Sequence, residues 1–515
     1  MSLADRFPRT FAALSALPGG LDVLEHLLHL ERGFGRHDAV HIITGGGPDR
    51  RHQLPEFDVV LCGGGLSLLY AALLSRRGCK VAVLDRRRIG CGHREWNISR
   101  AELAPLVRSG LYTAAEVEAL VRMQYRVGLC RWHEGGCYPV SGVLDCVIDA
   151  EGLLAGLRRR AEEAGALLLD HHQLVAYRTG PAGVALTLLH QPPRGSPGRP
   201  RELTTRLLID GMGAHSPHAR FDLCCPTVGG VMAGLACGTA PDELDPSVGE
   251  VLVTTEGVEQ GRQHLWEGFP APGGDPAGAT GQTDRMTVYL FHYCEPATLG
   301  EHPLLSLYER FFATLPRYKR GELRLVRPTY GFIPAYSRLR PMPVAPRDRV
   351  LLVGDAASRH SPLTFCGFGS MIRSFLPVSE GVLRCLERDD LSRRALQAVW
   401  GEPPALRVMG GLTLMMAATR AGRRARLRDG QQVNRLLDAA FATLSAAGPE
   451  VYASFLRDEI GFADFVRFMR GTARRYPAVY RDVWSHLGVG EVMRWLLRLV
   501  SLAWAQKGIS RWVSG

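Results

Sequence analysis

The chain has 515 residues, of which 46% are hydrophobic and 22% are charged, proportions that match an ordinary globular protein. This length exceeds a usual domain of about 100–200 residues, so we expect two or three packed modules and exclude a peptide-sized binder. We find no apolar run of about 18 residues, no N-terminal signal pattern and no solenoid repeat, which predicts a soluble or peripheral protein. Residues 391–515 carry 19 Lys and Arg against 9 Asp and Glu, and so hold +10 of the net charge of +11.

The first 56 residues predict an extension and linker without recognisable chemistry. Leu21–Leu30 is a short amphipathic stretch, and a Gly/His/Arg-rich run follows it and ends at Pro55. The 12 cysteines of the chain form no CxxC pair and have no histidines at zinc spacing. We therefore expect buried thiols in a reducing compartment and no metal site.

A β-α-β unit of about 30 residues follows the linker. The apolar run Phe57–Cys62 predicts a strand, and a helix is expected over Leu66–Arg77 after three glycines. Gly78 ends that helix, and Lys80–Leu84 predicts a second strand.

The turn of this unit has the residues of a dinucleotide site. Gly63 makes the tight turn, and Gly65 allows the backbone to approach a pyrophosphate at the helix N-terminus, where free N–H groups favour anions. Gly64, between them, is assigned to the cofactor site as well. Asp85 ends the second strand 22 residues after Gly63, where a carboxylate accepts hydrogen bonds from a ribose. Leu68 stands at the third glycine position, which predicts a wider helix–strand separation.

The middle of the chain alternates between helical and extended patterns. A helix is expected over Ala150–Ala164, and the cluster Pro192–Pro200 predicts a surface hairpin loop. Between about 226 and 330 the alternating patterns favour an antiparallel sheet, and from about 391 the pattern is helical. Strands are expected at Leu167–Leu169, Val184–Leu189, Leu207–Ile209, Val251–Thr254 and Met286–His292.

A second glycine-aspartate turn comes about 290 residues after the first. The apolar run Val350–Val353 ends in Gly354 and Asp355; Pro362 follows, and Gly367 and Gly369 open an expected helix. This segment resembles the second FAD motif of the p-hydroxybenzoate hydroxylase-like flavoproteins. The resemblance implies that Asp355 binds ribitol and that the later glycines bring backbone N–H groups towards the flavin pyrimidine.

Together, the two motifs imply FAD as the cofactor and a doubly wound, Rossmann-like α/β domain that is interrupted by a substrate domain. The predicted layout is an extension and linker (1–56), a first FAD-binding part (57–225), an antiparallel substrate domain (226–330), a second FAD-binding part (331–390) and a helical, basic C-terminal region (391–515).

The segment Arg94–Arg100, Arg-Glu-Trp-Asn-Ile-Ser-Arg, looks like a signature of the CruA/CruP-type lycopene cyclases. The block from Gly354 to Arg373 is the other specific match, and the similarity spans roughly residues 57–470. Further similar patches lie at 210–217, 265–270, 331–336, 433–437 and 455–458. The resemblance implies a redox-neutral cyclisation of lycopene ends into β-ionone rings, dependent on reduced FAD, with electrons from NAD(P)H or another donor. We assign Arg94 to the cofactor site.

Such a cyclisation needs a carboxylic acid that an apolar pocket keeps neutral, a base, and an electron-rich surface beside the cation. We choose Glu267 as the acid because Trp266, Phe269 and Pro270 surround it in sequence and would desolvate it. The alternative is an exposed carboxylate on a strand edge. Glu95 is the second choice, although an ion pair with Arg94 or Arg100 would keep it ionised and structural.

Three polar residues near the motifs have no settled role at this stage. Asn97 either hydrogen-bonds the flavin or fixes a loop. His215 and His360 sit near motif turns, where lone histidines are more often structural than catalytic.

The basic C-terminal region predicts contact with an anionic membrane surface, from which a carotenoid would be extracted. Val492–Ala505 combines Arg494 and Arg498 with Trp495, Leu496, Leu499, Leu502 and Trp504, a pattern typical of an interfacial helix. A dense basic cluster precedes it at Arg420, Arg423, Arg424, Arg426 and Arg428. The alternative is that these helices only pack on the core. No recognised nucleic-acid-binding motif accompanies the arginines, so nucleic acid is not expected.

Two rival functions stay open. One is a FAD-dependent monooxygenase or reductase of the same fold; a halogenase would need a WxWxIP-like stretch, which the sequence lacks. The other is a CruP-like paralogue with an accessory role and no cyclase turnover. We expect a cytoplasmic, peripheral membrane protein of a bacterium; the lack of a Ser-rich, acid-poor transit segment disfavours a plastid without excluding it.

Overall fold

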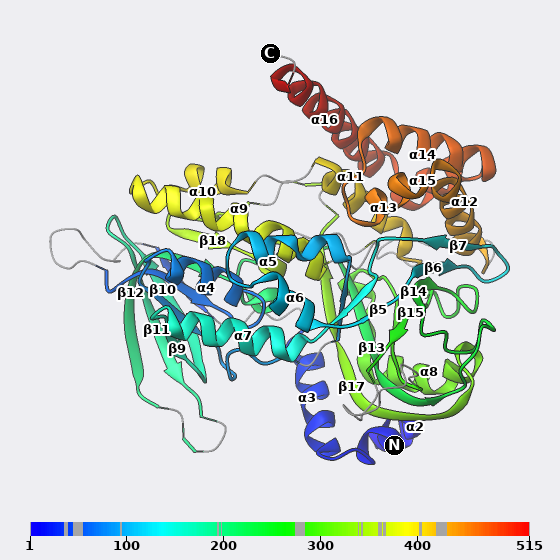
Figure 1. Cartoon of the computed structure of the whole chain (residues 1–515), viewed down its shortest axis with the longest axis horizontal. Helices are drawn as coiled ribbons and strands as arrows, with labels where there is room; N and C mark the ends of the chain where they lie inside the picture. Colours follow the sequence, from blue (N-terminus) through cyan, green and yellow to red (C-terminus); the bar gives the residue numbers. More distant parts are fainter. Residues whose placement is uncertain are drawn as a thin grey trace.

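The computed structural model describes residues 2–34, 40–44, 55–92, 95–192, 195–196, 198–272, 284–337, 339–340, 343–358, 363, 367–400, 404–418 and 430–513, with side chains up to residue 504. Two large sheets lie side by side, and the C-terminal helices stand above the second sheet (Figure 1).

The first sheet has the strand order β1-β10-β11-β12-β2-β3-β9, and β18 pairs with β12. β18, β12, β2, β3 and β9 run parallel, whereas β10, β11 and β12 form an antiparallel ribbon. The strands are β1 His41–Thr44, β2 Phe57–Cys62, β3 Val81–Leu84, β9 Leu167–Leu169, β10 His172–Thr179, β11 Val184–His190, β12 Pro200–Asp210 and β18 Val350–Leu352.

Both faces of this sheet are covered, which explains why its central strands are continuous apolar runs. In β2, Val59 and Leu61 point to the helices, while Val60 and Cys62 point to the antiparallel ribbon. The helices of this part are α4 Leu68–Arg76, α5 Ala104–Arg108, α6 Ala114–Leu120, α7 Ala150–Glu163, α9 Gly367–Glu387 and α10 Arg393–Val399. The predicted β-α-β unit is present within one or two residues of its expected bounds.

The second sheet is antiparallel apart from the β14–β6 pair, and its order is β17-β13-β16-β15-β14-β6-β7. Its β6 and β7 come from the segment assigned to the first FAD-binding part, so this sheet extends beyond residues 226–330. The strands are β6 Val127–Arg131, β7 Cys137–Val140, β13 Leu223–Leu235, β14 Val248–Val253, β15 Leu265–Pro270, β16 Met286–Phe291 and β17 Gly321–Ala335. A small third sheet joins β4 Trp96–Ile98, β8 Cys146–Ile148 and β5 Val121–Gln124.

The N-terminal residues are more than an extension and linker. α2 Pro8–Ser15 and α3 Gly20–Gly33, preceded by α1 Leu3–Arg6, pack against α8 Pro303–Tyr318 at the bottom of the second sheet (Figure 1). The Glu31 carboxylate accepts hydrogen bonds from the backbone N–H groups of Leu304 (2.7 Å) and Leu305 (3.0 Å). It thereby caps the first turn of α8, where the helix dipole favours a negative charge.

The C-terminal region is helical, as the sequence predicted, and is anchored on the second sheet. The buried Asn434 accepts a hydrogen bond from the Thr254 hydroxyl (2.8 Å) and donates one to the Glu256 carbonyl (2.9 Å). Within the described residues, no helix is long and apolar enough to cross a membrane. The helices are α11 Pro404–Thr413, α12 Gln432–Ala447, α13 Pro449–Leu456, α14 Phe462–Arg475, α15 Val479–Leu487 and α16 Val489–Val513.

Candidate functional site

The turn after β2 has the geometry of a dinucleotide turn. Gly63 has φ +111°, and a Cβ at this position would lie 2.4 Å from the Gly211 carbonyl oxygen, so a side chain does not fit. A Cβ at Gly65, in contrast, would meet no protein atom within 4 Å. The Gly65 backbone therefore faces open space, as close approach to a pyrophosphate requires.

Asp85 lies directly beside this turn. Its Oδ2 accepts a hydrogen bond from the backbone N–H of Gly64 (2.7 Å), and its Oδ1 accepts one from the backbone N–H of Arg87 (2.8 Å). These two bonds fix the carboxylate on a cavity of about 120 Å³, which His172 and His215 also line. The cavity has the residues that a ribose and its adjoining phosphate need, and it places His215 on the nucleotide side of the site.

The second motif lines a larger cavity of about 320 Å³ between the two sheets. Gly354 and Asp355 form a 3-10 turn after β18, and α9 begins at Gly367 on the same cavity. Gly65 and Gly211 line both cavities, so the two spaces adjoin at the glycine turn. Segments about 290 residues apart in sequence thus meet around one elongated space, which fits the two halves of FAD.

Three predicted cofactor residues are not among the described residues that line the two cavities. Arg94 and Pro362 lie outside the described residues, as does His360. Gly369 packs against the Glu102 carboxylate, since a Cβ there would lie 2.4 Å from Glu102 Oε1. Its role is therefore close helix packing, whereas Gly367 faces the cavity.

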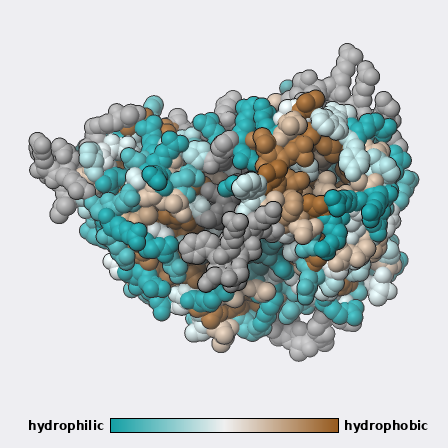
Figure 2. Space-filling view, turned by 90° about the horizontal axis from the view of Figure 1, so that it is seen from above, coloured by the Kyte–Doolittle hydropathy of each residue, from teal (hydrophilic) through white to brown (hydrophobic). Residues whose placement is uncertain are grey.

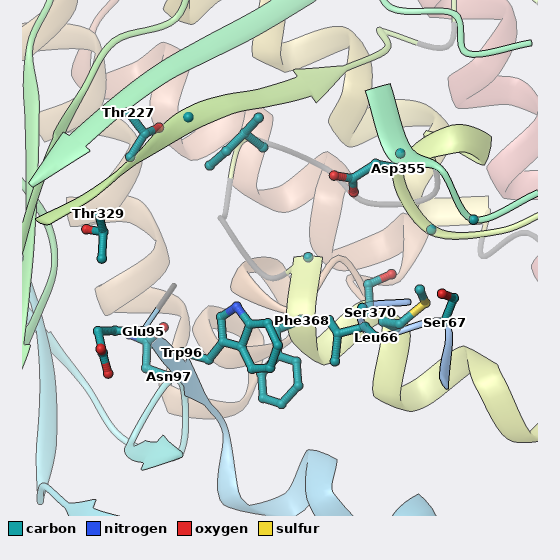
Figure 3. A pocket seen from close by; sticks show the side chains of 18 of the residues that line it. Leu66, Ser67, Glu95, Trp96, Asn97, Thr227, Thr329, Asp355, Phe368 and Ser370 are labelled. Atoms are coloured by element: carbon teal, nitrogen blue, oxygen red, sulfur yellow. The ribbon is translucent and has the colours of Figure 1, made fainter. Parts of the chain in front are cut away.

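Aromatic side chains form one wall of the larger cavity. Trp96 on β4 stacks on Phe368 at the start of α9, with ring centroids 4.8 Å apart and planes 18° apart. In Figure 3 this pair lies between Glu95 and Asn97 on one side and Leu66, Ser67 and Ser370 on the other. A planar aromatic wall of this kind suits a flat ring system or a polyene.

Glu267 lies on the central strand β15 and is 7% exposed. Its Oε1 accepts a hydrogen bond from the Asn97 side-chain amide (3.1 Å), and among the described residues it forms no ion pair. Burial raises the pKa of Glu267 to about 7, and the hydrogen bond from Asn97 opposes the rise. The side chain lines the larger cavity, so an exposed position on a strand edge is excluded.

The source of this desolvation differs from the expected one. Neighbouring residues of a strand point to opposite faces, so Trp266 points away from Glu267 and stacks on Tyr318, with centroids 4.6 Å apart. Tyr289 lies directly opposite Glu267 on β16, and Phe269 follows two residues later. The expectation that Trp266 desolvates Glu267 was wrong.

Glu95 lines the same cavity but has a cationic partner. Its carboxylate forms an ion pair with Arg327 on β17, and the Tyr289 hydroxyl donates to its carbonyl oxygen (3.0 Å). Burial raises the pKa of Glu95, and the charge of Arg327 opposes that rise. The ion pair that the sequence led us to expect is thus made with Arg327, while Arg100 pairs with Glu118.

The sequence did not indicate several residues of the site: Tyr289, Thr227 and Thr329, which line the larger cavity, and Arg327, which pairs with Glu95. Arg327 is 232 residues from Glu95, and no local pattern links the two. Tyr289 lies in a strand that the sequence did predict. The alternation of side chains along this strand could have shown which of its residues share a face. It could not have shown that this face lines the site.

No protein-family model matches the chain, and no curated protein sequence matches it. Solved structures do match. The halogenase PltM has a TM-score of 0.56 at 13% identity, over 88% of this chain and 97% of the halogenase. The same halogenase in complex with phloroglucinol and FAD has a TM-score of 0.53 at 13% identity, over 85% and 98%.

A geranylgeranyl bacteriochlorophyll reductase-like protein from Thermoplasma acidophilum is also similar. It has a TM-score of 0.52 at 14% identity, over 86% of this chain and 99% of that protein. At these identities the similarity establishes the fold. The predicted α/β fold, with an antiparallel second sheet and a helical C-terminal region, is confirmed.

Proposed function

We propose that the chain binds FAD across the two adjoining cavities and acts as a lycopene β-cyclase-like isomerase. Support for FAD comes from the open Gly65 backbone, the Asp85 and Asp355 carboxylates, and the fold shared with a FAD-bound halogenase. Support for the cyclase comes from the resemblance of the segments around Glu95 and Gly354. Both segments line the larger cavity.

The observation that carries the proposal is the state of Glu267. A buried carboxyl that lacks a cationic partner among the described residues, with a pKa of about 7, keeps about half of its population protonated at neutral pH. It faces a cavity with aromatic and aliphatic walls. This is the arrangement that protonation of an isolated carbon–carbon double bond requires.

In the proposed reaction, Glu267 donates its proton to the terminal double bond of a linear carotenoid end. The tertiary carbocation is attacked by a neighbouring double bond, and one new carbon–carbon bond closes the ring. Loss of a ring proton restores a double bond. One proton is gained and one is lost, so the product is an isomer of the substrate.

Two further residues have roles in this scheme. Asn97 holds the Glu267 carboxyl towards the cavity through its amide. Glu95, paired with Arg327, attracts the cationic end and accepts the ring proton. Reduced FAD, when bound, would supply negative charge beside the cation, with electrons from NAD(P)H or another donor.

A FAD-dependent monooxygenase or reductase is the second candidate, favoured by the halogenase and the reductase-like protein that share the fold. Such an enzyme consumes NAD(P)H in proportion to its product, whereas an isomerase does not. The missing WxWxIP stretch disfavours a halogenase. A CruP-like accessory protein would bind FAD and carotenoid without turnover.

The test is expression in a lycopene-accumulating bacterium, followed by pigment analysis. We expect the wild type to form cyclic carotenoids, and Glu267→Gln to lose at least about 100-fold in rate, the usual contribution of a general acid. Glu250→Gln is the matched control, because Glu250 is a buried carboxyl on the neighbouring strand that pairs with Lys319 instead of facing the cavity.

Flavin absorbance of the purified proteins reports folding and cofactor binding independently of turnover. Equal cyclisation by wild type and Glu267→Gln would remove Glu267 as the acid. A folded, yellow wild type that converts no lycopene would instead favour the accessory function, and stoichiometric NAD(P)H oxidation would favour the oxidoreductase.

A further inference from the structure

Helix α16 is apolar on two sides. On one side Val492, Trp495 and Leu502 are buried in the core of the second sheet and the C-terminal helices. The Trp495 indole N–H donates to the Val408 carbonyl of α11 (3.1 Å). Three of the residues that the sequence offered as membrane anchors, Trp495, Leu499 and Leu502, thus pack on the protein.

The opposite side of α16 carries a second set of apolar residues, and these are exposed. They recur at intervals of three and four residues and fall within about 100° of the helix circumference. Tyr480 and Trp484 extend the set onto α15, which contacts α16. We call the set the α15–α16 face: Tyr480, Trp484, Val489, Met493, Leu496, Leu497, Val500 and Trp504.

The exposure is large for such residues: Trp504 is 75% exposed and Leu497 66%. The exposed large hydrophobic side chains of the described residues number twelve, and eight of them belong to this face. Figure 2 shows hydrophobic surface gathered on the half of the molecule that bears the C-terminal helices. A contiguous patch of this kind marks a contact surface.

We infer that the α15–α16 face docks on an anionic lipid bilayer, with α16 parallel to the surface. The positive charge of the C-terminal region favours an anionic bilayer as the partner of this face. The C-terminal region holds +10 of the net charge of +11, and Arg494 and Arg498 lie on α16 to one side of the apolar stripe. A second copy of the chain would bring two strongly basic regions together, whereas anionic headgroups neutralise them.

The side chains of the face match the interfacial layer of a bilayer. Trp484, Trp504 and Tyr480 combine an apolar ring with a polar atom, as residues at the headgroup level do. Arginine side chains beside the stripe are long enough to keep their charge among the headgroups while the stripe enters the acyl region. The face therefore lies on a membrane without crossing it.

The docking face is joined to the candidate site through packed elements. α16 packs on α11, and the His486 ring of α15 lies 3.0 Å from the Leu414 carbonyl that follows α11. Leu414 shares a hydrophobic core with Tyr289 and Phe291, which line the larger cavity. The idea that the bilayer supplies an apolar substrate depends on the proposed function. The docking of the α15–α16 face on the bilayer does not depend on it.

Vesicle flotation of the full-length, FAD-supplemented protein tests the inference. We expect binding to phosphatidylcholine vesicles that contain phosphatidylglycerol, and weaker binding to phosphatidylcholine alone. The triple variant Leu497→Gln, Val500→Gln, Trp504→Gln should bind at least about tenfold more weakly. Arg494→Gln with Arg498→Gln should lose about fivefold for each arginine near the surface, and only at low salt.

Leu21→Gln is the matched control, because Leu21 is 71% exposed but lies on α3, far from the face. It should bind vesicles like the wild type, and all variants should keep the thermal unfolding midpoint, since the altered residues are exposed, apart from Arg498, which is half-buried. Vesicle binding that the triple variant retains would overturn the inference. A second result would also overturn it: the wild type does not bind vesicles, light scattering shows that it is a dimer, and the triple variant is a monomer. In that case the face would be covered by a second copy of the chain.

Discussion

Glu267 and Trp266 are adjacent in the chain but belong to different environments. The strand turns Trp266 towards Tyr318 and Glu267 towards the cavity, where burial raises its pKa against the opposing hydrogen bond from Asn97. Glu95 lines the same cavity with Arg327 as a partner. Two carboxyl groups on one cavity thus have different electrostatic partners, which is how acid and base roles are separated in enzymes.

The pKa of Glu267 also has a consequence for stability. Because burial raises this pKa from 4.5 to about 7, folding favours the protonated form. The resulting stabilisation is complete below about pH 4.5 and is lost as the pH rises through about 7. Glu267→Gln removes this dependence, so its free energy of unfolding relative to the wild type should increase by about 2–3 kcal/mol between pH 5 and 8.

Denaturant unfolding of both proteins across this pH range measures the difference. The Glu250→Gln variant provides the comparison for a buried carboxyl that has a cationic partner. A pH-independent difference between Glu267→Gln and the wild type would show that Glu267 has an ordinary pKa in the folded protein.

Among the elements, the turn between β2 and α4 shows two distinct reasons for a glycine. Gly63 is required by the fold itself, because its φ is positive and the Gly211 carbonyl lies in the way of a side chain. Gly65 has room for a side chain, so the fold does not require a glycine there. Under the proposed function, a glycine is required there because the FAD pyrophosphate approaches the backbone.

Gly65→Ala should therefore keep the fold and lose FAD. We expect an unchanged unfolding midpoint for the cofactor-free protein and at least about tenfold weaker FAD binding, because the methyl group occupies the pyrophosphate position. Fluorescence titration with FAD measures this affinity. Gly490→Ala is the control, since a Cβ there also meets open space but lies on α16; equal FAD affinity of the two variants would contradict the assignment of the turn.

At the scale of the whole molecule, the N-terminal helices are part of the folded unit. α3 links several elements, since the His26 ring lies 2.9 Å from the Tyr330 hydroxyl and 3.3 Å from Arg87 Nη1. Tyr330 lines the larger cavity and Arg87 the smaller one. A segment without recognisable chemistry thus braces both halves of the candidate site.

Leu27→Ala tests this bracing. Leu27 is fully buried in the core beneath the second sheet, so its truncation should lower the free energy of unfolding by about 2–5 kcal/mol. Leu21→Ala, in the same helix but exposed, should change it by less than about 0.5 kcal/mol. Thermal and denaturant unfolding measure both; a small effect of Leu27→Ala would mean that these helices contribute little to the fold.

The sequence by itself determined the fold class and the two turns that border the cavities. Strand, glycine turn and helix are encoded by residues close together in the chain, through periodicity and backbone freedom, so their bounds could be predicted. Glu267 could be chosen from its apolar neighbourhood. The tertiary structure decided the contacts: Arg327 as the partner of Glu95, Asn97 as that of Glu267, and the sides of α16 that are buried or exposed. Local periodicity shows on which face of a helix or strand a residue lies, but packing between distant segments determines what that face contacts.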